Sequence, residues 1–476
     1  MINTHSDNRP TKVHFIGIGG TGMLAGARLA IECGFEVRGS DGPLYPPASE
    51  MVKELGVTVY TGFAEQNLEW KPDLIVVGNA FSRGHVEIEE MLRRRVPYTS
   101  LPEFLKHTVL QKRIPVVITG THGKTSTTAL TAYLMEACGL EPGWLIGGQP
   151  LDLPTPSRLG EEGKPFVIEG DEYDSAFFDK RAKFFHYLPV IAVVTSIEMD
   201  HADIYASVEE IEHSFQLMLR QIPSDGTLIA CADDRRTVKL ARHAHCRVHT
   251  YGFSKEAHWK GCYTGISSGF SGLLIERSGK RYAELAVPLA GRHNLQNTLA
   301  AVAATSLMGG KPADITEAMM QYKGVRRRME VFLERDGITY VDDFGHHPTA
   351  MKETIAASRE LWPGRRLRVL IEPRSNTMVR NGHQHLMASA LQAADEVYFG
   401  PIYRAQRIPF DERLDRDAVL AELAEMRVMG KSFDQVEKLA EHILSSGKKG
   451  DLVLIFSNGS FDGIYDLFRA NENNQA

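Results

Sequence analysis

The stretch of residues 114–135 constrains the fold more than any other, because it predicts a buried strand, a glycine-rich turn and a helix in direct succession. Glycines in the turn allow backbone N–H groups to surround an anion, and the N-terminus of the helix adds a partial positive charge. Lys124 supplies a charge for the β- and γ-phosphates of a nucleotide, and Thr125 supplies a hydroxyl for Mg²⁺. The sequence therefore predicts a nucleotide-binding loop over residues 120–126.

This loop has the compact pattern G-x-x-G-K-T, with glycines at Gly120 and Gly123. The general phosphate-loop motif requires a further glycine where this chain has Ile118, so the strict motif is absent. The alternative is a glycine-rich turn that precedes an ordinary helix. The preceding strand and the hydroxyls that follow favour the nucleotide-binding interpretation, which includes Thr121 and Ser126.

Length and composition limit the class of protein. The chain has 476 residues, enough for about three domains, and its hydrophobic fraction of 43% and charged fraction of 24% are typical of a globular protein. The formal net charge of -6 argues against a nucleic-acid partner, and no apolar stretch approaches the roughly 20 residues that span a membrane. The five scattered cysteines lack metal-binding spacing and the N-terminus lacks a signal-peptide core, so we expect a cytoplasmic location.

A first α/β unit, residues 1–109, is predicted ahead of the loop. A strand at 13–18 leads into the pattern G-x-G-x-x-G at 17–22, then into a helix at 23–33 and a second strand that ends near Asp41. This βαβ arrangement is typical of folds that bind dinucleotides at the helix N-terminus. The motif alone is weak, because a nucleotide diphosphate, NAD or close packing of helix on strand would each satisfy it.

Polar residues follow several predicted strands of the second unit, residues 110–325. Glu169 and residues 171–174 follow one strand, and residues 198–203, which include His201, follow another. Ligands of an open parallel sheet bind at the carboxyl edge of its strands, so these side chains are expected beside the nucleotide-binding loop. At least one carboxylate is expected to serve a substrate or Mg²⁺, which takes carboxylate and phosphate oxygens together. The alternatives are a solvated acidic turn and a structural histidine.

Two asparagines precede a helix that is predicted at residues 298–307. Asn294 and Asn297 are three residues apart and share one helix face, which suits either recognition of a purine ring or N-capping by Asn294. A third α/β unit, residues 326–476, follows with further alternating strands. The predicted fold is therefore α/β with three domains: a Rossmann-like first domain, a central domain with a parallel sheet and the nucleotide-binding loop, and a Rossmann-like third domain.

Arg374 follows a predicted strand of the third unit. It suits a carboxylate group of a ligand, because a guanidinium binds carboxylates through two parallel hydrogen bonds. The alternative is a surface ion pair.

Three nucleotide-type α/β units in series are more specific than any one of them. Over nearly its whole length the sequence resembles the Mur ligases, the ATP-dependent amide-forming ligases of bacterial cell-wall synthesis. The stretches that carry the resemblance are HFIGIGGTGM, RGSD, GTHGKTSTT, EGDEYD, DHADIY, GRHNLQN, RRRME and DDFGHHPTA. The resemblance implies UDP rather than NAD in the first domain, ATP and Mg²⁺ in the central domain, and an acyl-phosphate intermediate.

The resemblance also implies roles for individual residues. The implied UDP-sugar contacts are Gly17, Gly19, Gly20, Gly22, Met23, Ser40, Asp41, Asn79 and Ser82. The implied ATP contacts are Gly120, Thr121, Gly123, Lys124, Thr125, Ser126, Asn294, Asn297, Arg328 (toward the phosphates) and Asp343 (toward the ribose). The implied Mg²⁺ ligands are Thr125, Glu169 and His201, and the implied catalytic residues are Lys124, Glu169, His201 and Arg328. The implied peptide contacts are Arg374, Ser375, Asn376 and His347.

The segments GIGGTGM and DDFGHHP resemble the branch of the family that acts directly on UDP-N-acetylmuramate. The segments EGDEYDSAFFDKRAKFFHYLP and EPRSNTMVRNGHQH resemble the members that add the recycled tripeptide L-alanyl-γ-D-glutamyl-meso-diaminopimelate. Addition of L-alanine is the alternative within the branch, and an NAD-dependent oxidoreductase or a non-catalytic nucleotide-binding scaffold is the alternative outside it. Several family members carry a carbamylated lysine where this chain has Gln216. We expect a monomer or a weak homodimer.

Overall fold

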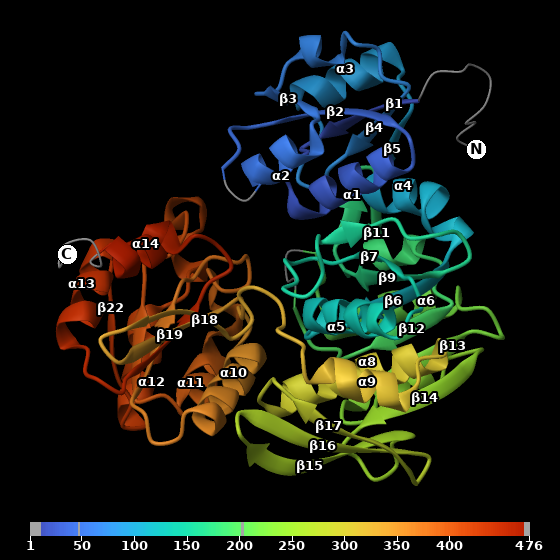
Figure 1. Cartoon of the computed structure of the whole chain (residues 1–476). Helices are drawn as coiled ribbons and strands as arrows, with labels where there is room; N and C mark the ends of the chain where they lie inside the picture. Colours follow the sequence, from blue (N-terminus) through green and yellow to red (C-terminus); the bar gives the residue numbers. More distant parts are fainter. Residues whose placement is uncertain (1–10, 46–47, 201–203, 471–476) are drawn as a thin grey trace.

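The computed structural model describes residues 11–45, 48–200 and 204–470, and these form three α/β lobes, each with its own main sheet (Figure 1). This architecture confirms the predicted fold class. No helix within those ranges combines the length and the apolar character needed to cross a membrane.

The first lobe is a five-stranded parallel sheet in the order β3-β2-β1-β4-β5. This order is that of a Rossmann-like half, whose switch point lies between β1 and β4. The elements are β1 (Lys12–Ile16), α1 (Thr21–Glu32), β2 (Glu36–Asp41), α2 (Ala48–Leu55), β3 (Thr58–Thr61), η1 (Glu65–Leu68), β4 (Leu74–Val77), α3 (Val86–Arg94), β5 (Tyr98–Ser100), α4 (Leu101–Thr108) and η2 (Leu110–Lys112).

The central lobe contains a ten-stranded sheet in the order β17-β16-β15-β14-β13-β12-β6-β9-β7-β8. Its strands are parallel from β15 to β7, and an antiparallel meander extends one edge. The elements are β6 (Ile114–Thr119), α5 (Lys124–Ala137), β7 (Gly143–Leu145), β8 (Ser157–Arg158), β9 (Pro165–Gly170), β10 (Asp174–Ala176), β11 (Asp179–Ala182), η3 (Lys183–His186), β12 (Ile191–Val194), α6 (Val208–Leu219), β13 (Thr227–Cys231), α7 (Arg235–Ala241), β14 (Arg247–Gly252), β15 (Trp259–Ser267), β16 (Phe270–Arg277), β17 (Lys280–Val287), α8 (Arg292–Leu307) and α9 (Pro312–Met319).

The third lobe has a six-stranded sheet in the order β18-β19-β23-β20-β21-β22, in which only the edge strand β18 is antiparallel to its neighbour. The elements are β18 (Glu330–Arg335), β19 (Ile338–Asp343), α10 (Pro348–Leu361), β20 (Leu367–Ile371), η4 (Asn381–His383), α11 (Gln384–Leu391), β21 (Glu396–Phe399), η5 (Ala405–Arg407), η6 (Phe410–Glu412), α12 (Arg416–Glu425), β22 (Met429–Ser432), α13 (Val436–Ser446), β23 (Leu452–Phe456), η7 (Phe461–Gly463) and α14 (Ile464–Ala470).

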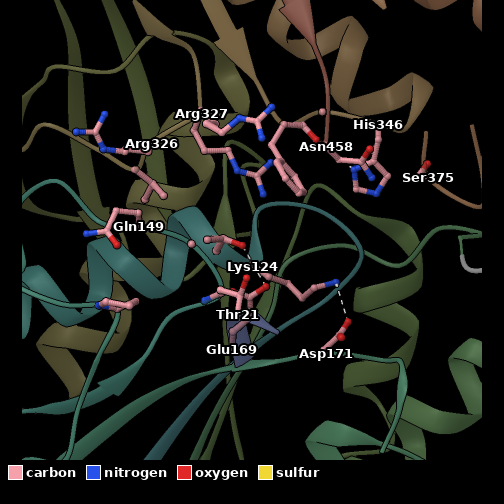
Figure 2. Close-up of a pocket in the computed structure, with 18 of the residues that line it drawn as sticks. Thr21, Lys124, Gln149, Glu169, Asp171, Arg326, Arg327, His346, Ser375 and Asn458 are labelled. Carbon is pink, nitrogen blue, oxygen red and sulfur yellow. Dashed lines mark hydrogen bonds and ion pairs between the residues drawn. The ribbon is translucent and has the colours of Figure 1, made fainter. Parts of the chain in front are cut away.

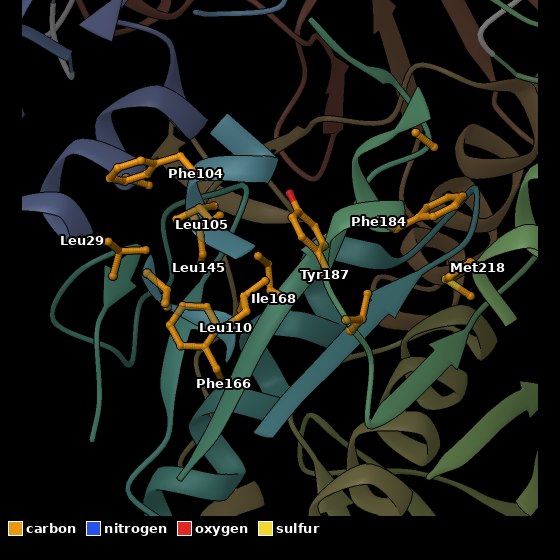
Figure 3. Close-up of a cluster of buried hydrophobic side chains, with 14 of the residues drawn as sticks. Leu29, Phe104, Leu105, Leu110, Leu145, Phe166, Ile168, Phe184, Tyr187 and Met218 are labelled. Carbon is orange, nitrogen blue, oxygen red and sulfur yellow. The ribbon is translucent and has the colours of Figure 1, made fainter. Parts of the chain in front are cut away.

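One continuous apolar core joins the first lobe to the central lobe. Leu29 and Phe104 of the first lobe belong to the same buried cluster as Phe166 and Phe184 of the central lobe (Figure 3). Polar contacts reinforce this junction: the Glu32 carboxylate, for example, accepts a hydrogen bond from the backbone N–H of residue 159 at 2.6 Å. Because a large apolar interface resists relative motion, these two lobes are expected to move as one body.

The third lobe has its own buried clusters and meets the central lobe mainly through polar contacts. The connecting chain includes Gly324, at a φ of 100°, and two residues of left-handed conformation, Arg327 at 60° and Met329 at 54°. Positive φ values outside glycine carry local strain, and hinges concentrate at such element termini. The third lobe is therefore the part best suited to move on substrate binding.

Candidate active site

A cavity of about 1150 Å³ is lined by all three lobes. Figure 2 shows Lys124, Glu169 and Asp171 on one side of it and His346 and Ser375 on another. The cavity exceeds the roughly 300–1,000 Å³ of an ordinary small-molecule pocket, so it has room for more than one substrate. Its lining includes Gly19, Thr21, Leu24, Thr121, Lys124, Thr125, Glu169, Asp171, Arg328, His346, His347, Arg374, Ser375, Asn376 and Tyr403.

The nucleotide-binding loop connects β6 to α5, as predicted, and two of its positions require glycine. Gly120 has a φ of 120°, and an added Cβ would lie 2.3 Å from the hydroxyl of Thr195. Gly123, the N-cap of α5, has a φ of 77°, and its Cβ would lie 2.4 Å from Oδ1 of Asn297. The backbone therefore packs closely against its neighbours while the helix N-terminus faces the cavity.

Lys124 is the first residue of α5 and lies among carboxylates. Its Nζ donates to Oε2 of Glu172 at 2.7 Å and lies 4.0 Å from Oδ1 of Asp171. Burial alone would lower the pKa of Lys124, but Glu172 and Asp171 outweigh it and raise this pKa above its ordinary value. The side chain is therefore a fixed cation with acidic partners that an incoming phosphate would have to replace.

Thr125 and Glu169 meet at the carboxyl edge of β6 and β9. The Thr125 hydroxyl donates to Oε1 of Glu169 at 3.1 Å, and the backbone N–H of Gly147 donates to Oε2 at 3.0 Å. Burial raises the pKa of the Glu169 carboxyl, although Lys124 opposes that rise. A cation beside these oxygens would stabilise the charged carboxylate, so the pair fits Mg²⁺. The third predicted ligand, His201, lies outside the described residues.

A second cavity of about 420 Å³ adjoins the loop and gathers the other predicted ATP residues. It is lined by Ser126, Asn294, Asn297, Arg328 and Asp343. Its position beside the helix N-terminus suits a nucleoside whose phosphates extend into the larger cavity.

Asp343 and Arg328 reach this second cavity from the third lobe and its connecting chain. The Asp343 carboxylate accepts hydrogen bonds from the backbone N–H groups of Met329 at 2.9 Å and Gly345 at 2.8 Å. Burial raises the pKa of Asp343, and Arg328 opposes the rise. The guanidinium of Arg328 lies 5.1 Å from the ring centre of Phe344 and lines both cavities.

The glycine loop of the first lobe lies between β1 and α1, with Gly19 and Thr21 facing the large cavity. Gly17 has a φ of 82° and packs against Phe81, whose ring would lie 2.2 Å from an added Cβ. The carboxylate of Asp41 accepts a hydrogen bond from the Gly19 N–H at 2.7 Å. Asn79 is exposed on the loop that follows β4. Gly20 is the N-cap of α1, and Gly22 and Met23 lie in the first turn of this helix. Ser82 is exposed.

Arg374 lies on the third-lobe side of the large cavity. Its Nη1 donates to Oε1 of Glu372 at 2.9 Å, and its guanidinium lies 4.0 Å from the ring centre of Tyr403. Glu372 is 5% exposed, so this contact is not the surface ion pair considered as the alternative. Ser375 and Asn376 line the same cavity, as does His347, which caps α10.

Comparison with known proteins gives matches along nearly the whole chain. Models described as "Mur ligase family, catalytic domain", "Mur ligase middle domain" and "Mur ligase, glutamate ligase domain" match residues 12–113, 118–305 and 327–459. A UDP-N-acetylmuramate–L-alanyl-γ-D-glutamyl-meso-2,6-diaminoheptandioate ligase of Escherichia coli K12 is 36% identical over 95% of this chain and 96% of that protein. The chain belongs to the Mur ligase family.

Among solved Mur ligases, a murein peptide ligase from Psychrobacter arcticus has a TM-score of 0.73 and 34% identity, covering 96% of this chain and 98% of that one. The UDP-N-acetylmuramate-alanine ligase of Thermotoga maritima has a TM-score of 0.79 but 25% identity, covering 98% of this chain and 99% of that one. A TM-score over several lobes also reflects how the lobes are placed, so the higher value does not outweigh the higher identity.

Two expectations change in this Mur ligase. The side chain of Ser40 is fully buried and donates to Glu87, with His14 at 3.2 Å, so a direct UDP-sugar contact by this side chain is not supported. Asn294 does not cap α8, because the helix begins at Arg292, six residues before the predicted start, with Gly291 as its N-cap. The side chain of Asn294 instead donates to the Ala290 carbonyl at 2.8 Å.

Sequence reasoning placed residues 198–203 beside the nucleotide-binding loop of this Mur ligase, but it did not predict the contacts that join them to the third lobe. The Glu198 carboxylate contacts His122 at 3.1 Å and accepts a hydrogen bond from the Thr349 hydroxyl at 2.8 Å, and His347 Nδ1 lies 3.8 Å away. Although burial opposes it, the contact with His122 helps to hold the pKa of Glu198 at about 2. The potential ligand atoms of His122, Glu198 and His347 lie within 4.8 Å of one another, a composition that metal sites share. Because Thr349 bonds to the same carboxylate, we assign the cluster as an interlobe contact.

Proposed function

We propose that the chain uses ATP to join L-alanyl-γ-D-glutamyl-meso-diaminopimelate to UDP-N-acetylmuramate through an amide bond, in the recycling of cell-wall peptide. The observation that carries the proposal is that one cavity contains Lys124 and Glu169, the first-lobe residue Gly19 and the third-lobe residue Arg374. A triphosphate, a nucleotide sugar and a peptide can therefore meet there. Family membership supports an ATP-dependent amide ligase, and the residues at each lobe support the three substrates.

The first step activates the carboxylate of the sugar, because a free carboxylate is a poor electrophile. A carboxylate oxygen attacks the γ-phosphorus of ATP, the bond from that phosphorus to the bridging oxygen breaks, and ADP leaves. Such a transfer depends mainly on positioning and charge neutralisation. Lys124 of the central lobe and Arg328 of the chain that leads to the third lobe both line the cavity and supply positive charge for the phosphates.

Mg²⁺ fits the oxygen donors of Thr125 and Glu169, and with His201 these residues would hold it. When bound, the ion neutralises charge on the phosphates and on the carboxylate. Burial raises the pKa of Glu169, and the positive charge of the ion would favour its charged form.

In the second step the free amine of the peptide attacks the acyl carbon. A tetrahedral intermediate forms, its oxyanion is stabilised by the same positive groups, and inorganic phosphate leaves with the bonding electron pair as the amine loses a proton. Arg374 binds a carboxylate of the peptide and thereby directs its amine into the cavity.

Arg374 would bind a carboxylate of either amine substrate, so the preference for the tripeptide over L-alanine rests on sequence similarity. A UDP-N-acetylmuramate–L-alanine ligase of Endomicrobium trichonymphae is 32% identical over 94% of this chain, below the 36% of the tripeptide-adding relative. We propose domains of residues 1–109 (UDP sugar), 110–325 (ATP) and 326–476 (peptide), and the family matches at 12–113, 118–305 and 327–459 support a division into three domains near these boundaries. A cytoplasmic monomer or weak homodimer completes the proposal.

The test supplies the purified chain with ATP, Mg²⁺ and UDP-N-acetylmuramate, together with tripeptide, L-alanyl-γ-D-glutamate or L-alanine. The expected result is UDP-muramyl tripeptide by mass spectrometry, with a kcat/KM for tripeptide at least about tenfold above that for L-alanine. If L-alanine were the preferred amine, the alanine-adding alternative would replace the proposal. If no amine supported phosphate release, the ligase assignment itself would fail.

A further inference from the structure

Two guanidinium groups, those of Arg374 and Arg404, contact the aromatic ring of Tyr403. The guanidinium carbon of Arg374 lies 4.0 Å from the Tyr403 ring centre, and that of Arg404 lies 4.8 Å from it. Tyr403 lines the large cavity, and its backbone N–H donates to the Pro373 carbonyl at 2.9 Å. This bond holds the backbone of Tyr403 against the segment that carries Arg374. The ring contacts both Arg374, which lines the cavity, and Arg404, which is exposed.

The side chain of Arg374 is held in place by its neighbours. Glu372, which is 5% exposed, accepts its Nη1 hydrogen bond, and the hydroxyl of Ser457 donates to the other oxygen of Glu372. Gly459 lies so close that an added Cβ would be 2.2 Å from Nε of Arg374. This support fixes the guanidinium in one place, which is what recognition of a carboxylate requires.

Arg404 has the opposite character. It is exposed, and among the described residues no carboxylate lies within ion-pair distance of it. It nevertheless has a left-handed backbone, with a φ of 50°, at the start of η5. Left-handed residues other than glycine cluster at ligand sites, where the surrounding structure maintains the strain.

We propose that Tyr403 and Arg404 determine specificity for the peptide beyond its first residue. The peptide amine must reach the acyl phosphate inside the cavity, so later residues extend outward. Arg374 then takes the free α-carboxylate of the γ-linked second residue, and Arg404 takes a carboxylate of the third residue. L-alanine has neither of these two groups. This inference rests on the proposed function and assigns the part of the same site that reads peptide length.

The test measures kcat/KM of the full-length chain for the tripeptide and for L-alanyl-γ-D-glutamate, with saturating ATP and UDP-N-acetylmuramate. Arg404→Gln is expected to lower the tripeptide-to-dipeptide ratio about tenfold, since one charge-assisted contact is lost. Arg407→Gln, the same charge change at an exposed neighbour, is the matched control and should leave the ratio as it is. Tyr403→Leu should lower kcat/KM for both peptides, and Tyr403→Phe, which keeps the ring, should restore most of the loss.

An unchanged ratio in Arg404→Gln would overturn the inference, as would an equal fall of the ratio in Arg407→Gln. Equal values for Tyr403→Phe and Tyr403→Leu would also contradict it, because the ring contact would then have no function. Failure of the proposed function is distinguishable, because the unsubstituted chain would not ligate either peptide. Circular dichroism of each variant identifies a change that comes from misfolding.

Discussion

The hydroxyl of Thr377 donates a hydrogen bond of 2.9 Å to Oδ1 of Asp200, and both side chains are buried. Thr377 lies two residues after Ser375, on the third-lobe side of the cavity, whereas Asp200 lies on the loop that follows β12 in the central lobe. This bond and the contacts of Glu198 with Thr349 join the third lobe to the nucleotide-binding lobe. In this structure the third lobe is therefore held against the central lobe next to the nucleotide-binding loop.

Thr377→Val removes that bond at nearly constant volume. A lost hydrogen bond to a buried carboxylate costs about 1.5–3 kcal/mol, so kcat should fall about tenfold or more because the lobes close less often. Thr377→Ser should retain most of the activity. Thr316→Val is a suitable control, since its hydroxyl bonds to Pro312 within the exposed part of α9. Steady-state phosphate release measures all three, and equal rates for Val and Ser variants would contradict the role of the bond.

Lys124→Ala should lower turnover by about 10³-fold, because it removes the cation placed for the phosphates. It should also destabilise the protein by about 3–5 kcal/mol, since Glu172, 1% exposed, loses the cation that faces it at 2.7 Å. Adding Glu172→Gln should restore the free energy of unfolding and leave turnover low. Urea unfolding and phosphate release separate the two effects; recovery of turnover in the double variant would argue against the phosphate role.

Gly459→Ala should displace Arg374 without unfolding the third lobe, because the atom in the way belongs to a flexible side chain 2.2 Å from the added Cβ. The expected effect is a fall of about tenfold in kcat/KM for the tripeptide, with the KM for ATP preserved. Gly382→Ala is the matched control, since nothing lies within 4 Å of its added Cβ. If both variants behaved alike, the position of Arg374 would have no bearing on peptide use.

Acidification should lower stability through His347. Burial, with His122 as the next cause, lowers the pKa of His347 to about 4, and His383 and Glu198 also face it. The unfolded chain takes up the proton first as the pH falls below about 6.5, so the free energy of unfolding declines between about pH 6.5 and 4, by up to about 1.4 kcal/mol per pH unit. His347→Asn keeps a cap for α10 but cannot titrate, and should flatten this decline in urea titrations at pH 7.5, 6 and 5. Parallel declines would contradict the assignment.

The alternation of strands and helices was predictable because each buried strand is a short apolar run followed by a turn, as in β6 and β9. The carboxyl edge also explains why Thr125 and Glu169 could be brought together from sequence. The start of α8 was not predictable in this way, since Gly291 caps it through its backbone at a φ of 89°, without a side-chain signal. Local motifs alone also gave no reason to expect the buried contact of Ser40 with Glu87.

The contacts that could not be predicted from the sequence are mainly those between segments far apart in the chain. Thr377 and Asp200 are 177 residues apart, and no local pattern specifies that they meet. The stack of Arg374 and Arg404 on Tyr403 likewise depends on how the chain after β21 returns to the chain after β20. Such pairs are fixed by tertiary packing, which periodicity and short motifs do not report.

The most direct test of the account labels the lactyl carboxylate of UDP-N-acetylmuramate with oxygen-18 and follows the label during ligation with ATP and tripeptide. If the centre at Lys124, Thr125 and Glu169 transfers the γ-phosphoryl group to that carboxylate, one labelled oxygen must appear in the released phosphate. Mass spectrometry of the phosphate should show this transfer in step with amide formation. Amide product accompanied by unlabelled phosphate would contradict the acyl-phosphate route and the function assigned to this centre.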